Sequence, residues 1–88
     1  MKRYKVLYYK RYLKDLEKIP KYFQEEIRIS IMELEKDPRP SGCKKLKGNS
    51  GLYRIRSGKY RIVYSINDDV LTILIIEIGH RKDVYECL

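Results

Sequence analysis

The fold is decided by residues 52–78, which read LYRIRSGKYRIVYSINDDVLTILIIEI. Leu52–Arg56 and Tyr60–Ile66 alternate between polar and apolar side chains, and this period of two is typical of half-buried strands. The turn formers SGK and NDD separate the three segments of the stretch. Val70–Ile78 is apolar on both faces, which indicates an interior strand of a sheet. The stretch therefore predicts three strands in succession, joined by tight turns.

The residues before this stretch predict one strand and two helices. Tyr4–Tyr9 is rich in aromatic and β-branched residues and is expected to form a short strand. From about Lys10 until Pro20 breaks or restarts the helix, apolar residues follow at helical spacing, namely Leu13, Leu16 and Ile19. A second, longer helix is expected to end before Asp37-Pro38-Arg39-Pro40, and its apolar stripe consists of Phe23, Ile27, Ile31 and Leu34.

Together these elements predict an α+β fold with the order β-α-α-β-β-β. We expect a helical hairpin packed on one face of a mainly antiparallel four-stranded sheet. The chain has 88 residues, of which 43% are hydrophobic, and this is enough for one packed core but not for two. Residues 1–88 are therefore expected to form a single domain.

Positive charge is concentrated in one part of the chain. The sequence holds 20 Lys and Arg against 12 Asp and Glu, a net charge of +8. Residues 39–61 have no acidic side chain and an excess as large as that of the whole chain, from Arg39, Lys44, Lys45, Lys47, Arg54, Arg56, Lys59 and Arg61. We interpret this stretch as a surface that binds the phosphate backbone of nucleic acid such as RNA, and a merely solvated basic face is the alternative.

The alternation of the strands predicts where the arginines point. Arg54 and Arg56 are two residues apart and share one face of their strand. On the next strand the helices need the apolar face, which leaves Arg61 on the open face of the sheet. Arg81 follows the last strand and is expected to reach the same surface. Four converging guanidinium groups favour a bound anion, such as a phosphodiester.

The residue inventory limits the chemistry of such a site. One histidine and two cysteines, Cys43 and Cys87, show no metal-binding spacing, so no metal and no other cofactor is expected. Arginines and tyrosines suit a reaction in which the substrate supplies its own nucleophile, as RNA does through its 2′-OH. The protein then aligns the attack and stabilises the negative charge that develops on the phosphorane.

The sequence favours a cytoplasmic protein. The longest apolar run, residues 70–76, is far shorter than the roughly 20 residues of a membrane span. No signal peptide is visible near the N-terminus. Two cysteines without a disulfide framework indicate free thiols in a reducing compartment. No membrane partner is therefore expected.

Two motifs resemble the RelE toxins of the RelE/ParE superfamily. They are LYRIRSGKYRIVY at residues 52–64 and IGHRKDVY at residues 78–85. The likeness runs over almost the whole chain, and it implies the RelE/ParE-like fold and a ribosome-dependent endoribonuclease. Such toxins cleave mRNA in the ribosomal A site and so inhibit translation. The resemblance also implies a cognate RelB-like antitoxin, with contact to operon DNA only through the toxin–antitoxin complex.

The resemblance assigns roles to individual residues. Arg54 and Arg56 match two basic residues on the strand before the turn, which are often lysines in the family. Arg61 matches the arginine that stabilises charge in the transition state. Arg81 matches an arginine that supports the leaving group or the phosphate, and Tyr85 matches a tyrosine that stacks on or orients the substrate.

The general base is left open by this sequence. Arg56 stands where a lysine has been proposed as the base in the family, and arginine is essentially never deprotonated. His80 is a candidate acid or base, because histidine titrates near neutral pH. A solvent-facing histidine without that role is the alternative.

Two other functions are compatible with parts of the sequence. A ParE-like toxin that inhibits gyrase shares the fold, and a small RNA-binding module without catalysis shares the basic stretch. Neither needs the complete set of Arg54, Arg56, Arg61, Arg81 and Tyr85. The joint presence of these residues favours the nuclease.

Overall fold

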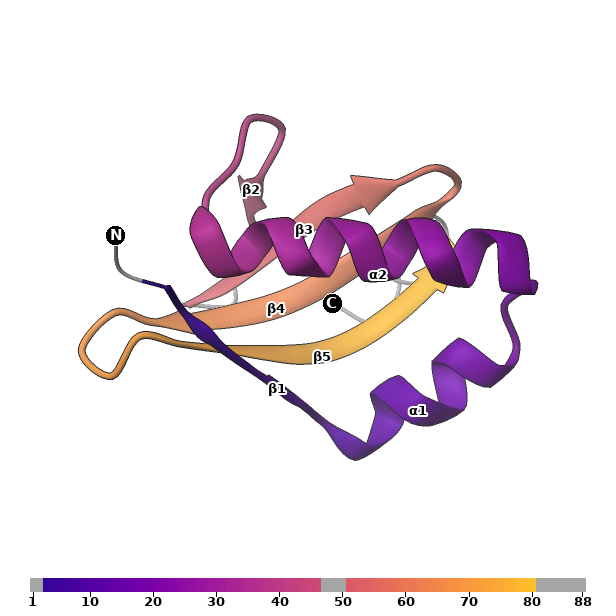
Figure 1. Ribbon diagram of the computed structural model, residues 1–88, viewed down its shortest axis with the longest axis horizontal. Helices are drawn as coiled ribbons and strands as arrows, with labels where there is room; N and C mark the ends of the chain where they lie inside the picture. Colours follow the sequence, from indigo (N-terminus) through magenta and orange to yellow (C-terminus); the bar gives the residue numbers. More distant parts are fainter. Residues whose placement is uncertain (1–2, 47–50, 81–88) are drawn as a thin grey trace.

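The computed structural model describes residues 3–46 and 51–80. Its elements follow the chain in the order β1 (Lys5–Tyr8), α1 (Lys10–Glu17), α2 (Lys21–Lys36), β2 (Lys44–Lys45), β3 (Leu52–Ser57), β4 (Tyr60–Asn67) and β5 (Thr72–His80). The strands form one sheet in the order β1-β5-β4-β3-β2 (Figure 1). β1 pairs with β5 in parallel, and all other neighbours are antiparallel.

The predicted α+β class and element order are confirmed, but the sheet has five strands rather than four. The additional strand is β2, whose Lys44 and Lys45 pair with Arg54 and Tyr53 of β3. Two lysines in a turn-rich loop show no alternation of polar and apolar residues, so the sequence pattern could not reveal this strand. β5 lies between β1 and β4, as its two apolar faces predicted.

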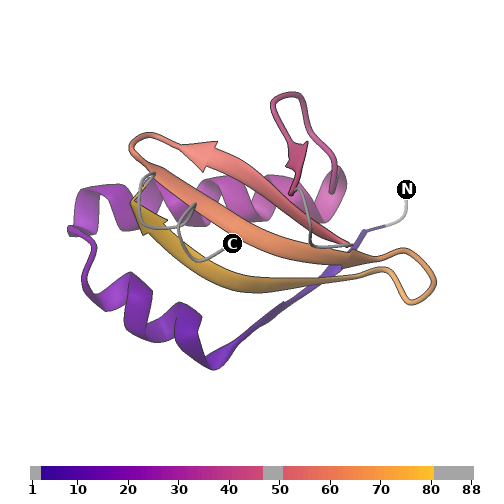
Figure 2. The ribbon, with the colours of Figure 1, turned by 180° about the vertical axis from the view of Figure 1, so that it is seen from behind.

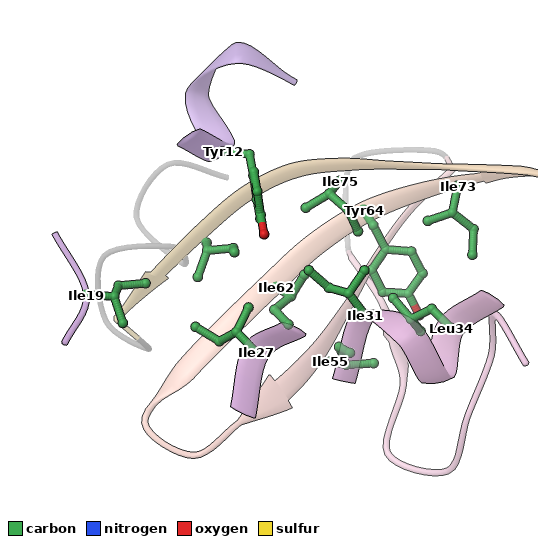
Figure 3. Close-up of a cluster of buried hydrophobic side chains, with 11 residues drawn as sticks. Tyr12, Ile19, Ile27, Ile31, Leu34, Ile55, Ile62, Tyr64, Ile73 and Ile75 are labelled. Carbon is green, nitrogen blue, oxygen red and sulfur yellow. The ribbon is translucent and has the colours of Figure 1, made fainter. Parts of the chain in front are cut away.

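The helix α2 lies across one face of the sheet and supplies much of the core (Figure 1). As predicted, Ile27, Ile31 and Leu34 are buried, because residues three and four apart fall on one side of a helix. Figure 3 shows these side chains among those of the strands, which include Ile55, Ile62, Tyr64, Ile73 and Ile75. The apolar faces predicted for the strands are therefore the faces that α2 covers.

The helix α1 contacts β5 beside the sheet, below α2 in the view of Figure 1. One position of its predicted stripe is wrong, because Leu13 is 61% exposed whereas Tyr12 is buried. Tyr12 and Leu16 are four residues apart and lie on the same side of the helix, a quarter turn away from Leu13. Among the described residues, neither helix has both the length and the apolar character that crossing a bilayer requires.

Tyr64 ties the loop after α2 to the sheet. Its side chain is fully buried, and its hydroxyl donates a hydrogen bond to the carbonyl oxygen of Pro38 at 2.7 Å. Since that bond uses the hydroxyl proton, the thiol of Cys43 is the donor in its 3.1 Å contact with the same oxygen. Burial, and after it the contact with Cys43, raise the pKa of Tyr64 far above its ordinary value, so the hydroxyl stays protonated.

A second tie joins the N-terminal segment, the same loop and the turn between β4 and β5. Asp68 accepts hydrogen bonds from the hydroxyl of Tyr4 at 2.6 Å and from the guanidinium of Arg39 at 2.9 and 3.3 Å. Arg39 also lies over the ring of Tyr53, 5.3 Å from its centroid. The bonds from Arg39, and next the bond from Tyr4, lower the pKa of Asp68 below its ordinary value.

We expect acid to weaken the interactions of Asp68 with Tyr4 and Arg39. The pKa of Asp68 is lower in the folded than in the unfolded chain, so its stabilising effect is complete above the unfolded pKa and is lost as the pH falls through the folded pKa. Asp68→Asn should lower the midpoint of urea unfolding at neutral pH and make the midpoint less sensitive to acid. Asp69→Asn, in the same turn, serves as the control. An equal acid sensitivity of Asp68→Asn and the unchanged protein would contradict this expectation.

Candidate functional site

Two rows of paired residues cross the sheet on the face opposite α2. In the first row Arg56 of β3 pairs with Arg61 of β4, which pairs with Gly79 of β5. In the second row Lys44, Arg54, Val63 and Glu77 follow one another across β2, β3, β4 and β5. Figure 2 shows this face, over which no helix of the described residues passes. The predicted convergence of Arg54, Arg56 and Arg61 on one face is therefore confirmed.

These arginines are less exposed than their place on an open face suggested. Arg61 is 2% exposed and Arg54 is 4% exposed, whereas Arg56 is exposed to solvent. Arg54 pairs with Val63, which is fully buried, and Arg61 pairs with Gly79, which has no side chain. An anion that reaches Arg54 and Arg61 would meet their charges away from bulk water, where the attraction is stronger.

A cavity of about 350 Å³ lies along β3 next to this face. It is bounded by α2, the following loop, β2 and β3, and its lining residues are Ser30, Glu33, Pro40, Ser41, Gly42, Lys44, Arg54, Ile55 and Arg56. Three cationic side chains against one carboxylate make this cavity electropositive. Of the described basic residues that were predicted to bind RNA, Lys44 is therefore the one beside Arg54 and Arg56.

Three other predicted RNA-binding residues lie elsewhere. Arg39 is paired with Asp68 at the end of the sheet farthest from Arg61. Lys45 pairs with Tyr53 and so belongs to the helix-covered face. Lys59 lies in the turn between β3 and β4, with its ammonium group 5.9 Å from the ring centroid of Phe23. The structure does not bring these side chains together with the arginine rows.

His80 lies on the other face of the sheet from Arg61. It pairs with Tyr60, and the two rings meet edge to face with centroids 6.1 Å apart. The alternation of β5 gives His80 the same direction as Ile78, toward the helix side. Lys47, Arg81, Tyr85 and Cys87 lie outside the described residues. Within residues 3–46 and 51–80, no group of three or more His, Cys, Asp and Glu is placed to hold a metal ion.

Glu77 is a residue of this face that the sequence reasoning missed. It is the one acidic residue in any described strand, and it is 6% exposed. Arg11 of α1 lies 3.2 Å from its Oε2 and 3.8 Å from Asp15, and Asp15 accepts a hydrogen bond from the backbone N–H of Ile78. The single carboxylate inside the apolar run ILIIEIG could have been noticed in the sequence. Its contacts with α1 could not have been predicted, because the residues of α1 are more than 60 positions away in the sequence.

Comparisons of the sequence with known proteins identify a toxin family. The family model described as "ParE toxin of type II toxin-antitoxin system, parDE" matches residues 6–85. Toxin RelE3 of Methanocaldococcus jannaschii is 36% identical, over 93% of this chain and 96% of its own length. The mRNA interferase toxin RelE of Escherichia coli is 31% identical, over 82% of this chain and 77% of its own length.

Comparison of the structures agrees with this assignment. A chain from the crystal structure of the archaeal RelE–RelB complex of Pyrococcus horikoshii matches with a TM-score of 0.79 and 32% identity, over 92% of this chain and 97% of that chain. A chain from the RelBE2 toxin–antitoxin complex of Mycobacterium tuberculosis matches with a TM-score of 0.82 and 28% identity, over 92% and 94%. The sheet that carries Arg54, Arg56 and Arg61 is therefore the sheet of RelE structures. The chain belongs to the RelE family within the RelE/ParE superfamily of type II toxins.

Proposed function

We propose that this RelE-family toxin is a ribosome-dependent endoribonuclease that cleaves mRNA in the A site. The observation that carries the proposal is the convergence of Arg54, Arg56 and Arg61 on one face, where two of the three are shielded from solvent. A relative from Escherichia coli that is 31% identical is named an mRNA interferase, which supports the same activity. The reaction inhibits translation by destroying the message on the ribosome.

The proposed reaction uses the nucleophile that RNA carries. The 2′-OH attacks the adjacent phosphate, and the arginines hold the phosphate in line and balance the additional negative charge of the phosphorane. A guanidinium group is suited to this because its planar fork contacts two phosphate oxygens at once. Arg61 is proposed as the principal stabilising group, with Arg54 and Arg56 as anchors. Arg81 and Tyr85 keep the roles that the family resemblance implies: Arg81 supports the leaving group or the phosphate, and Tyr85 stacks on or orients the substrate.

The proposed partners are the ribosome with its mRNA and a RelB-like antitoxin. Structures of related RelE toxins from Pyrococcus horikoshii and Escherichia coli are complexes with RelB. Operon DNA would be contacted only through the toxin–antitoxin complex, and the site of action is the cytoplasm. Lys44 and the electropositive cavity next to Arg56 extend the surface available to either polyanionic RNA or an acidic partner.

Primer extension on a reporter mRNA in a translating extract tests the proposed function. We expect discrete cuts at A-site codons that require active ribosomes, because the substrate must be held by the ribosome. Intact mRNA together with inhibited DNA supercoiling would indicate a gyrase inhibitor instead. RNA binding without cleavage or gyrase inhibition would indicate a non-catalytic module. Either result would overturn the nuclease proposal.

A further inference from the structure

We propose that Glu77 is the general base that removes the proton from the attacking 2′-OH. The inference rests on the proposed nuclease function and deepens it by naming a group for a step that neither the sequence nor the family resemblance assigns in this chain. It is carried by the place of Glu77 on the arginine face, its burial, and the contacts that hold it there.

The pairing of the strands puts Glu77 next to the arginines. It lies opposite Val63, while Arg61 lies opposite Gly79, so Glu77 and Arg61 are diagonal neighbours on the same face. Diagonal neighbours in an antiparallel pair are about 7–8 Å apart at the backbone, within reach of long side chains. A phosphate bound by Arg61 would sit over Gly79 and Val63, and its neighbouring ribose would then come within reach of the Glu77 carboxylate.

Contacts with α1 hold this carboxylate in one orientation. Arg11 approaches its Oε2 at 3.2 Å, and the side chain of Glu77 is only 8% exposed. The backbone N–H of Ile78, the next residue of β5, donates a hydrogen bond to the carboxylate of Asp15. The same helix therefore holds both the side chain and the backbone at this point of β5. A carboxylate whose orientation is fixed by its neighbours is the arrangement that general-base catalysis requires.

The charged groups around Glu77 favour the transfer of a proton from the 2′-OH to its carboxylate. Arg11 and Asp15 face it from α1, and Arg61 and Arg54 lie on the neighbouring strands β4 and β3. Glu77 is the one proton acceptor that the described strands place among these cations. Arg56 on the same face remains protonated, and His80 points to the other side of the sheet.

The proposed step balances without a cofactor. Glu77 takes the proton of the 2′-OH, the bond from O2′ to phosphorus forms, and the bond from phosphorus to O5′ breaks. The departing O5′ takes a proton from solvent, and Glu77 later returns its proton to solvent. The products are a 2′,3′-cyclic phosphate and a 5′-hydroxyl end.

The test is the single-turnover rate of cleavage on programmed ribosomes with saturating toxin. We expect Glu77→Gln to lower the rate by about 10²–10⁴-fold, the usual effect of losing a general base, and to remove the acid limb of the pH–rate profile. Glu77→Asp keeps a carboxylate and should retain that limb at a reduced rate. Arg11→Gln breaks the ion pair but leaves the base, so it should lose less than the lower bound of about 10²-fold expected for loss of the base and also keep the acid limb.

Folding is followed by thermal unfolding of every variant. The double variant Glu77→Gln with Arg11→Gln removes both charges of the Arg11–Glu77 pair, and it should be as slow as Glu77→Gln alone. Glu25→Gln, which breaks an exposed ion pair with Arg28 on α2, is the matched control and should leave the rate unchanged. If the unchanged protein cuts mRNA and the folded Glu77→Gln variants cut at a similar rate with the same pH profile, only the assignment of Glu77 is overturned. If the unchanged protein leaves mRNA intact, the proposed nuclease function is overturned and this assignment with it.

Discussion

Replacement of Arg61 by alanine is expected to lower the rate of mRNA cleavage by about 10²–10³-fold, the usual effect of removing one group that stabilises transition-state charge. Arg61 is 2% exposed and lies between Arg56 and Gly79 in the first row. Its charge therefore acts away from bulk water, where no solvent dipole can replace it. Arg61→Lys keeps the charge but loses the two-point contact with phosphate, so its rate should fall between those of the alanine variant and the unchanged protein.

The rate is measured by the same primer extension on programmed ribosomes. Arg28→Ala is the control, because Arg28 is an exposed arginine on α2, on the other side of the sheet. Circular dichroism and thermal unfolding show whether Arg61→Ala retains the fold. A folded Arg61→Ala variant that cuts as fast as the unchanged protein would remove Arg61 from the mechanism.

Replacement of Tyr64 by alanine is expected to cost about 3–5 kcal/mol of unfolding free energy, as for other large buried aromatic side chains. Tyr64 is fully buried under α2 and fills the space between the sheet and the loop that follows the helix. Small domains have only about 5–15 kcal/mol in total, so the variant should be largely destabilised at physiological temperature. Urea unfolding followed by circular dichroism measures the change.

Tyr64→Phe tests the contribution of the hydroxyl alone, because phenylalanine keeps the ring. It leaves the buried carbonyl of Pro38 without its donor, which should cost about 1–3 kcal/mol. Tyr22→Phe, at an exposed position of α2, should change stability by no more than about 0.5 kcal/mol. If Tyr64→Phe were as stable as the Tyr22→Phe control, the hydrogen bond to Pro38 would have no part in holding the loop.

The sequence predicted those features of the fold that depend on short-range periodicity. The period of two placed Arg54, Arg56 and Arg61 on one face, and the helical spacing identified Ile27, Ile31 and Leu34 as core residues. The same alternation, continued to the end of β5, would have placed His80 on the helix side, away from the arginines. These inferences succeed because strand and helix geometry are fixed by the backbone alone.

The features that were missed depend on contacts between distant segments. The burial of Arg61 and Arg54 is a property of the assembled chain and cannot be read from the alternation of one strand. The role of Arg11 beside Glu77 depends on where α1 comes to lie, which periodicity does not determine. Tyr12 escaped notice because tyrosine is compatible with both surface and core positions.

The parallel pairing of β1 with β5 has a consequence for the biosynthesis of the toxin. β1 is made early, yet each of its residues pairs with a residue about 67 positions later in the chain, as Lys5 does with Thr72. A nascent chain therefore cannot complete the sheet until β5 has left the ribosome, and pairing across so large a separation makes folding comparatively slow. The arginine rows need β4 and β5 as well, so incomplete translation products lack the assembled site. The topology delays toxicity until β5 has been made and has left the ribosome, an interval in which an antitoxin already present can engage the newly made chain.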